Sequence, residues 1–250
     1  MHFTAYAAPD TPEEVVSLLE NRKNRIAAGN LWLRLSSNRG HTMIDLKNLG
    51  WDRIEEEAHS FLIGACVSLH MLETHEGLNR MCGNLFAKGL RSIVGVQLRN
   101  AATLGGCVYM RAGFSDLLTM LLPLNASVLL YPEEEIPLKD YIQLQPRREL
   151  LRGVRIPKQN LRMAYRSIRN TAGNLPILNC CVASSETGLF AAIGARPGRA
   201  VLSGGTGETP EGLLEKVAAL RYSTNDAASA DYRRHLAKVL TERCLREIGL

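Results

Sequence analysis

The sequence lacks the long apolar run and the leader-like start that mark membrane and exported proteins. Its richest apolar stretch, residues 115–130, is interrupted by Asp116 and Asn125, whereas a membrane-spanning helix needs about 18 or more consecutive apolar residues. The first six residues contain neither a basic cluster nor an apolar segment, which are the parts of an export signal. We therefore expect a cytoplasmic protein without a membrane span.

The sequence also lacks the cysteine spacing of a metal centre. Its six cysteines form no C-x-x-C pair, the arrangement that zinc and iron–sulfur sites commonly use. Most of them lie in apolar stretches, as buried reduced thiols do. We expect no metal site on this chain and reduced thiols at Cys66, Cys82, Cys107, Cys180, Cys181 and Cys244.

Common catalytic signatures are absent too. The sequence contains no H-E-x-x-H, G-x-S-x-G, G-x-x-x-x-G-K-[ST] or G-x-G-x-x-G motif, which removes the best support for a hydrolase, a P-loop enzyme or a Rossmann domain. The six histidines fall in expected surface helices or loops, with no paired nucleophile motif. We expect no catalytic residue on this chain.

Positive charge is in modest excess and unevenly distributed. The chain has 30 Lys and Arg against 25 Asp and Glu, a formal net charge of +5, which is not by itself a signature of nucleic-acid binding. A basic stretch runs from Arg147 to Arg169, with Glu149 as its single acid and few aromatic residues beyond Tyr165. Nucleic-acid binding there would rest on charge alone, so we expect no nucleic-acid partner.

Composition and periodicity predict a globular protein of mixed structure. The chain is 46% hydrophobic and 22% charged over 250 residues, enough to bury a core. Thr11, Pro12 and Glu14 form a capping box with a first-position proline, which predicts a helix over 12–21. Apolar patterning predicts further elements. These are strands at 26–33, 43–46, 61–67 and 128–131 and helical segments at 69–90 and 117–124, the latter capped from Ser115-Asp116.

The second half predicts strands followed by helices. A connection is expected at 137–148. Consecutive strands with short turns then imply an antiparallel sheet with helices on one face. The last helix is expected to turn Tyr232 and Leu236 inward. The expected strands are 150–156, 163–168, 177–184 and 189–195, and the expected helices are 210–220 and 231–248, which gives an α+β protein of two lobes divided near 150–158.

Two turns of small residues are the candidate binding elements. One is Ala27-Ala28-Gly29-Asn30 and the other is Thr103-Leu104-Gly105-Gly106-Cys107. Glycines let successive backbone N–H groups converge on an anion without obstruction by a Cβ atom. Such turns also occur as plain bends, so both interpretations stand on the residues alone.

The context of the second turn resembles a known family. The run Gln97–Gly106, followed by Asp116-Leu117-Leu118 and by residues 121–126, resembles the FAD-binding subunit of the molybdenum hydroxylases, the xanthine dehydrogenase and carbon monoxide dehydrogenase family. In that family the run reads approximately Q-I-R-N-x-A-T-I-G-G-N. The family's A-G-G-T-D-L, I-G-A, E-L-L-x-x-x-x-I-P and Y-R segments are similar to residues 27–32, 63–65, 149–157 and 232–233, in this order.

The resemblance implies a fold and domain organisation. It implies an α+β, two-lobed FAD-binding domain of the PCMH type over residues 1–157, with a small α/β subdomain at about 1–58 and a mixed sheet with helices at 59–157. A C-terminal domain over 158–250 is expected to pack an antiparallel sheet on helices. The match runs along almost the whole chain.

The resemblance also implies a set of FAD-binding residues. The flavin's pyrophosphate would lie between the two turns, mostly on backbone N–H groups. Asp116 would reach polar groups of the flavin nucleotide, Leu151 would lie beside the ring, and Arg166 would stand for a family lysine near it. The implied set is Ala27, Ala28, Gly29, Asn30, Leu31, Ile93, Thr103, Gly105, Gly106, Cys107, Asp116, Leu151 and Arg166.

Three of these residues have a simpler alternative role. Asp116 can cap the helix that begins at Leu117, Thr103 can satisfy its own turn, and Arg166 can be an exposed strand residue of the basic stretch. For Asp116 the two roles are compatible.

Four residues depart from the family pattern. Ala28 stands where the family has glycine, Asn30 where it has threonine, Leu31 where it has aspartate and Cys107 where it has asparagine. The family's A-S-P before the aspartate is also missing. A left-handed Ala28 would cost about 1 kcal/mol, and each lost hydrogen-bonding side chain roughly 0.5–1.5 kcal/mol. Weaker FAD binding is the expected consequence.

The implied function is electron transfer within a multi-subunit molybdenum hydroxylase. FAD on this chain would receive electrons from iron–sulfur clusters on a small partner subunit and pass them to an acceptor such as NAD⁺. Hydroxylation would take place at a molybdopterin centre on a large partner subunit. The alternative is a structural subunit of such a complex that holds FAD weakly or not at all.

Overall fold

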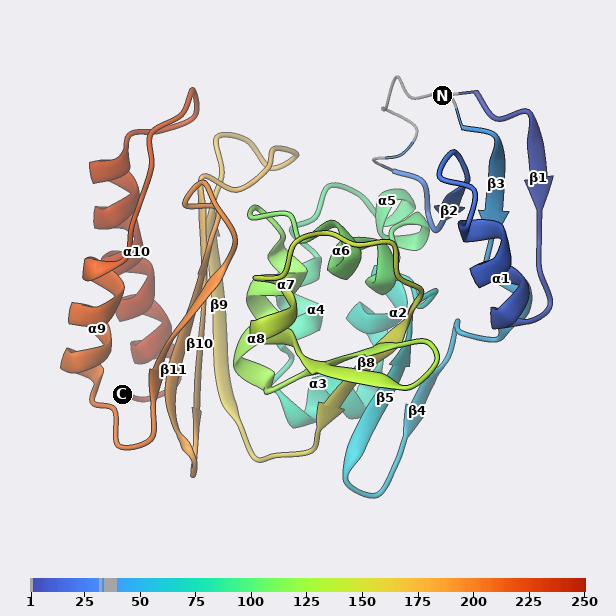
Figure 1. Ribbon diagram of the computed structural model, residues 1–250. Coiled ribbons are helices and arrows are strands. Elements are labelled where there is room, and N and C mark those ends of the chain that lie inside the picture. The colour runs from blue at the N-terminus through green and yellow to red at the C-terminus, as the bar shows by residue number, and fades with distance from the viewer. Residues whose placement is uncertain (1, 32, 34–39) are drawn as a thin grey trace.

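The computed structural model describes residues 2–31, 33 and 40–250. Within this part of the chain the strands form three sheets. Figure 1 shows a layer of short helices between two of these sheets, with the third sheet in the N-terminal lobe. No helix of the described residues is long and apolar enough to cross a membrane.

The N-terminal lobe is a small parallel sheet with one helix. Its strands follow the order β1-β3-β2 and are parallel. Thr11 accepts a hydrogen bond from the Glu14 N–H, and the Glu14 carboxylate accepts one from the Asp10 N–H, so the predicted capping residues do begin the helix. The elements are β1 (Ala5–Ala7), α1 (Pro12–Leu19), β2 (Arg25–Ala27) and β3 (Thr42–Asp45), with a 3₁₀ turn at Lys47–Leu49.

The middle of the chain builds a five-stranded antiparallel sheet in the order β4-β5-β8-β6-β7. Strand β8 comes last in the sequence of this sheet and lies at its centre. The sequence pattern predicts this segment in one sheet with the strands that follow it, and this prediction is wrong, because β8 pairs with β5 and β6. The strands are β4 (Ile54–Glu56), β5 (Ser60–Gly64), β6 (Ser127–Leu130), β7 (Glu134–Pro137) and β8 (Leu151–Pro157).

The expected connection at 137–148 contains structure that the sequence pattern did not indicate. Strand β7 reads Glu-Glu-Ile-Pro and lies at the sheet edge with most side chains exposed. An acidic edge strand carries no apolar alternation, because neither of its faces is fully covered. The short helix α8 (Leu138–Tyr141) follows directly and buries Leu138 and Tyr141.

Short helices fill the space between this sheet and the C-terminal sheet. Ser115 caps α7 by accepting a hydrogen bond from the Leu118 N–H, and all residues of α7 are buried. The predicted buried helix is therefore confirmed, although it ends in a 3₁₀ turn at Leu122–Leu124. The helices are α2 (Leu69–Thr74), α3 (Glu76–Met81), α4 (Leu85–Leu90), α5 (Val96–Ala101), α6 (Leu104–Met110) and α7 (Asp116–Leu121).

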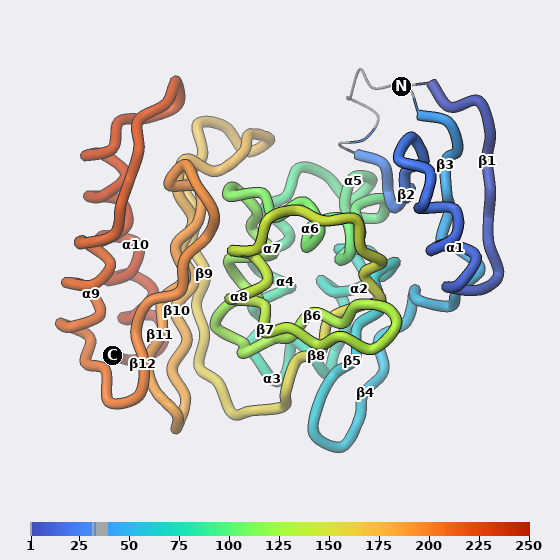
Figure 2. Tube along the Cα trace, viewed as in Figure 1, coloured from blue at the N-terminus to red at the C-terminus, as the bar shows by residue number. Residues whose placement is uncertain are grey.

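The C-terminal part is an antiparallel sheet in the order β12-β11-β10-β9. Figure 2 shows α9 and α10 on one face of this sheet and the central helices on the other. The sequence missed β12, because two of its five residues are glycines and glycine weakens the strand signal. The elements are β9 (Arg162–Ile168), β10 (Leu178–Ser185), β11 (Gly188–Gly194), β12 (Val201–Gly205), α9 (Pro210–Ala219) and α10 (Ala230–Glu247).

Helix α10 buries an arginine where the sequence pattern suggested a tyrosine. Tyr232 is 45% exposed, whereas Arg233 is 1% exposed, so the expected inward position of Tyr232 was wrong. The Arg233 guanidinium donates to three carbonyl oxygens, those of Ile177 (3.0 Å), Ser223 (2.8 Å) and Ala228 (2.7 Å), and to the side chain of Asn225 (2.5 Å). This one side chain joins α10 to the loop before it and to the start of β10.

We expect Arg233→Met to lower the free energy of unfolding by about 3 kcal/mol, because it leaves buried carbonyl oxygens without a donor. Arg234→Met is the matched control, since Arg234 forms an exposed pair with Asp231 that contributes at most about 1 kcal/mol. Urea unfolding followed by circular dichroism measures both. Equal losses in the two variants would contradict the structural role of Arg233.

Candidate functional site

The fold brings the two small-residue turns into direct contact. Gly29 has a left-handed backbone (φ 59°), and a Cβ atom placed on it would lie 1.9 Å from the carbonyl oxygen of Ala101. A Cβ atom on Gly106 would lie 3.7 Å from the Ala28 carbonyl oxygen. The first turn, which follows β2, therefore packs on the chain that leads from α5 into α6. Figure 1 shows these elements side by side.

The second turn uses its backbone N–H groups within the protein. The Leu104 N–H donates to the Val67 carbonyl (2.8 Å) and the Gly105 N–H to the Ala65 carbonyl (2.8 Å). Thr103 caps α6, because its hydroxyl accepts from the Gly106 N–H (3.2 Å). The expected row of free N–H groups is thus corrected: the turn offers the Thr103 hydroxyl and the small size of its glycines.

The first turn carries polar groups that have no hydrogen-bond partner among the described residues. The Asn30 side-chain oxygen is buried and has no hydrogen-bond partner among the described residues. The backbone N–H groups of Gly29 and Leu31 also have no acceptor among the described residues. A carboxamide presents either an acceptor oxygen or a donor NH₂ group when it turns. This turn is therefore the place where a polar ligand would be held.

The expected strain at Ala28 is not found. The left-handed residues are Gly29 (φ 59°) and Asn30 (φ 58°), while Ala28 keeps a negative φ. Asparagine is, after glycine, among the residues that adopt this conformation most readily. The alanine at position 28 therefore adds no backbone penalty.

Asp116 is the first residue of α7 and its carboxylate is held by the C-terminal sheet. Its Oδ1 atom accepts hydrogen bonds from Arg169 Nη2 (2.5 Å) and from the Tyr165 hydroxyl. The capping role considered for Asp116 belongs to Ser115 instead. Within the described residues Oδ2 forms no hydrogen bond, so this oxygen remains for a ligand.

Burial and the negative charge of Asp116 raise the pKa values of two neighbouring side chains, Tyr165 and Cys107. Burial raises the pKa of the Tyr165 hydroxyl well above its usual range, and the negative charge of Asp116 adds to the shift. Burial, with a smaller contribution from Asp116, raises the pKa of the Cys107 thiol to about 12. Cys107 is therefore a neutral thiol near pH 7 and not a nucleophile.

The structure does not bring Arg166 to this site. Arg166 lies on β9 with its side chain on the face that packs against α10, where it pairs with Glu247 (2.7 Å). Tyr165 points to the opposite face, toward Asp116, because side chains alternate along a strand. The structure therefore places Arg166 apart from Asp116, and the cation that pairs with Asp116 is Arg169.

The two apolar candidates lie in the central core. Leu151 is buried there, and Ile93 is half-buried against the same cluster. The Ile93 carbonyl accepts a hydrogen bond from Arg99 Nη1 (3.0 Å), and Arg99 also pairs with Glu73 (2.8 Å). Sequence reasoning missed this buried arginine, although Arg99 belongs to the Q-L-R-N run.

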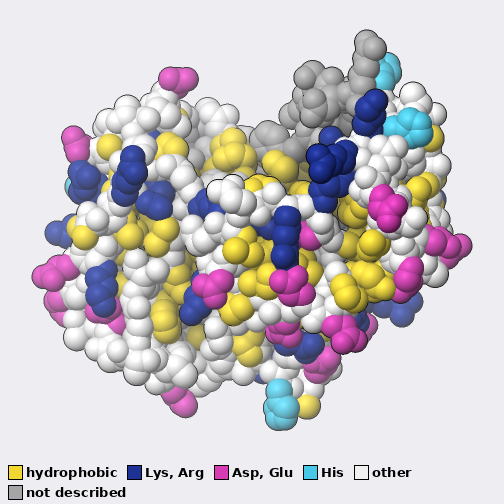
Figure 3. All heavy atoms as spheres, viewed as in Figure 1, with side chains coloured by type: hydrophobic (Ala, Val, Ile, Leu, Met, Phe, Trp, Pro, Cys, Tyr) yellow, Lys and Arg dark blue, Asp and Glu magenta, His cyan; other side chains and the backbone are white. Residues whose placement is uncertain are grey.

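Several basic side chains of the stretch from Arg147 to Arg169 pair with acids of the chain. Arg155 pairs with Glu57, Lys158 with Glu56 and Arg147 with Glu134. Figure 3 shows positive and negative side chains interspersed on the visible face. These pairings reduce the positive charge that the stretch presents, so its charge alone gives little support to nucleic-acid binding.

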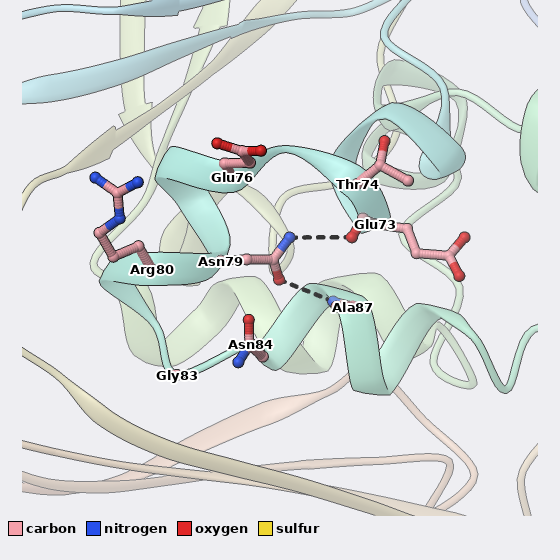
Figure 4. A pocket seen from close by; sticks show the side chains of 8 residues that line it. All are labelled: Glu73, Thr74, Glu76, Asn79, Arg80, Gly83, Asn84 and Ala87. Atoms are coloured by element: carbon pink, nitrogen blue, oxygen red, sulfur yellow. Dashed lines mark hydrogen bonds between the residues drawn. The ribbon is translucent and has the colours of Figure 1, made fainter.

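Two depressions on the surface of the described residues are lined by residues outside the two turns. One, of about 540 Å³, is formed by α2, α3 and α4 (Figure 4). In it the Asn79 side chain donates to the Glu73 carbonyl (3.0 Å) and accepts from the Ala87 N–H (2.9 Å). The other, of about 610 Å³, shares Thr74 and Glu76 with it. The Asn79 bonds join neighbouring helices, so we assign this depression a structural role.

Comparison with known proteins identifies relatives of this arrangement. Residues 1–159 match the family described as the FAD binding domain in molybdopterin dehydrogenase. No curated protein sequence matches the chain. Among solved structures, quinoline 2-oxidoreductase from Pseudomonas putida 86 is 20% identical (TM-score 0.83, covering 99% of this chain and 97% of that chain).

Two carbon monoxide dehydrogenases are similar to the same extent. The enzyme from Hydrogenophaga pseudoflava that lacks the Mo-pyranopterin moiety is 21% identical, with a TM-score of 0.86 over 99% of this chain and 97% of that chain. The reconstituted enzyme from Oligotropha carboxidovorans is 20% identical, with a TM-score of 0.87 over 99% of this chain and 98% of that chain. At this identity the likeness establishes the fold.

We expect Gly29→Ala to lower the free energy of unfolding by about 2–4 kcal/mol, since it combines a left-handed alanine with a clash against Ala101. Gly50→Ala is the control, because Gly50 is also left-handed (φ 70°) but has no atom within 4 Å of an added Cβ, and should lose about 1 kcal/mol. Urea titration of both variants measures the difference. If the two losses were the same, the contact between the turns would not be stabilising.

Proposed function

The chain belongs to the family of FAD-binding domains of molybdopterin dehydrogenases, and we propose that it is the FAD-carrying, electron-transferring subunit of a multi-subunit molybdenum hydroxylase. The contact of the two turns carries this proposal. It joins the unpartnered Asn30 side chain to the Thr103 cap of α6. These are the two segments that would enclose a flavin's pyrophosphate.

The residues present fit FAD. On the first turn, the N–H groups of Gly29 and Leu31 and the half-buried side chain of Asn30 would hold phosphate oxygens, with Ala27 and Ala28 shaping the turn. On the second turn, the Thr103 hydroxyl would contribute a hydrogen bond, and Gly106 and Cys107 would leave room for the cofactor, while Gly105 packs on Ala65. We propose that Asp116 Oδ2 accepts hydrogen bonds from the sugar-like hydroxyls of FAD. We also propose that Ile93 and Leu151 make apolar contact with the flavin ring.

When bound, FAD supplies the conversion between one-electron and two-electron transfer. This chain's own residues bind and orient it. Cys107, with a pKa raised to about 12, stays neutral beside it and adds no negative charge to the phosphates. Asp116 is paired with Arg169, so its charge is compensated within the protein.

The partners follow from the proposed family role. We propose that a large subunit holds the molybdopterin centre and the hydroxylation site, and that a small subunit holds the 2Fe–2S clusters. The carbon monoxide dehydrogenase from Hydrogenophaga pseudoflava is an enzyme with a molybdenum cofactor, of which the form compared above lacks the Mo-pyranopterin moiety, and this supports the arrangement by analogy. NAD⁺ as the acceptor and a cytoplasmic location stay predictions.

We also propose the domain boundary near residue 157. Strand β8 ends at Pro157 and completes the five-stranded sheet, whereas β9 begins at Arg162 in the C-terminal sheet. The match to the family ends close by, at residue 159. The first domain would span 1–157, with subdomains of about 1–58 and 59–157, and the second 158–250.

A structural subunit with weak or no FAD binding is the second candidate. The N–H groups of Leu104 and Gly105 already donate to carbonyl oxygens in the segment that follows β5. In addition, Leu31 and Cys107 replace hydrogen-bonding side chains of the family pattern. These observations favour lower affinity. A subunit of this kind would keep the fold and its contacts with partners but would remain colourless.

We expect the full-length chain to bind FAD and to show the flavin absorption band near 450 nm. Gly106→Val should weaken binding at least tenfold, because an added Cβ lies 3.1 Å from the Thr103 hydroxyl oxygen and faces the Ala28 carbonyl. Gly205→Val is the control, since an added Cβ there meets no atom within 4 Å. Titration with FAD, followed by flavin fluorescence, gives both dissociation constants.

A colourless wild-type chain that leaves millimolar FAD unbound would contradict the redox function and favour the structural subunit. Equal affinities of Gly106→Val and Gly205→Val would instead show that the second turn does not contact the cofactor. Circular dichroism of each variant separates loss of binding from loss of fold.

A further inference from the structure

The C-terminal sheet reaches into the proposed cofactor site through two side chains. Tyr165 on β9 and Arg169, one residue beyond the strand, lie four positions apart, and both donate to Asp116 Oδ1. The side chains of Arg169 and Asp116 are 10% and 7% exposed. Both donors lie beyond residue 159, where the match to the family ends.

Arg169 joins three segments at this point. Its guanidinium donates to Asp116 on α7 (2.5 Å), to the Asn174 carbonyl in the loop after β9 (2.7 Å) and to the Ser92 hydroxyl (3.4 Å). Ser92 directly precedes Ile93, the proposed apolar contact. The Nε–H of Arg169 is buried and has no acceptor among the described residues. The cation is thus fixed from three sides and still has a free donor.

The positive charge of Arg169 allows the buried Asp116 carboxylate to lie close to a ligand. In a buried setting an unpaired carboxylate is strongly unfavourable, and next to a diphosphate it would repel the ligand. The ion pair with Arg169 compensates the negative charge of the Asp116 carboxylate. Its Oδ2 atom, which has no hydrogen bond within the described residues, can then accept one from a ligand. A fixed cation close to a flavin also favours its reduced, anionic form.

We infer that Arg169 is the positioning cation of the FAD site: it holds Asp116 in place and compensates its charge. The position expected from the sequence, Arg166, has no part in this. The inference rests on the proposed function, since it concerns the same cofactor. It makes FAD binding depend on a residue of the C-terminal domain.

The test compares two arginines of one strand segment in the full-length chain. Arg169→Leu should weaken FAD binding at least tenfold and lower the midpoint potential of the bound flavin. Arg166→Leu removes an ion pair of similar length on the opposite face, with Glu247 (2.7 Å), and should leave both values unchanged. Arg169→Lys keeps the charge and should restore most of the potential and part of the affinity.

Fluorescence titration with FAD and spectroelectrochemical titration of the bound flavin provide the two readouts. Wild-type affinity and potential in Arg169→Leu would overturn the inference. If Arg169→Leu does not fold, Tyr165→Phe removes only one donor to Asp116 and should weaken FAD binding several-fold, whereas an unchanged affinity would overturn the inference. A wild-type chain that binds no FAD would instead refute the proposed function.

Discussion

A contact between backbone atoms holds the candidate site together. Gly29 lies against the Ala101 carbonyl so closely that no side chain fits between them. This contact joins the N-terminal lobe to the helical layer, and it places the turn after β2 beside the cap of α6. Because the left-handed conformation falls on Gly29 and Asn30, the turn closes without strain on Ala28. The other features of the site depend on this approach.

Paired charges connect the lobes to one another. Arg148 donates to the carbonyls of Leu19 (2.8 Å) and Arg22 (3.1 Å), which ties the end of α1 to the segment before β8. Arg155 on the central strand β8 pairs with Glu57 beyond β4 and with Glu135 on β7, so acids at both sheet edges meet one cation. The ion pair of Asp116 with Arg169 connects the helical layer to the C-terminal sheet. Acids within the chain therefore compensate part of the positive charge along residues 147–169.

The residues at and near the departures from the family pattern have different structural roles in the folded chain. Asn30 occupies a left-handed position that suits it, and its buried side-chain oxygen has no partner in the described residues. Cys107 is a neutral thiol beside Asp116. Arg111, which stands just before the altered A-S-P segment, is buried against Glu149 and lies over the Tyr141 ring (4.0 Å). The substitutions thus alter which groups are polar around the turns and leave the path of the backbone intact.

Local signals in the sequence determined where most elements begin. The Thr11 and Ser115 caps, the apolar run of α7 and the strand segments of β9 to β11 depend on neighbouring residues alone, and these predictions were confirmed. The two turns were each indicated by their own run of small residues. Sequence order could not show that β8 pairs with β5 and β6, since strand pairing depends on segments far apart in the chain.

Only the tertiary structure decided the roles of individual charged side chains. Arg166 and Arg169 are equivalent in a basic stretch until the face of β9 is known, and then one meets Glu247 and the other Asp116. Arg233 became a core residue because carbonyls from the loop before α10 and from the start of β10 converge on it. A charge is buried only where distant groups satisfy it, and the positions of those groups are a property of the folded chain.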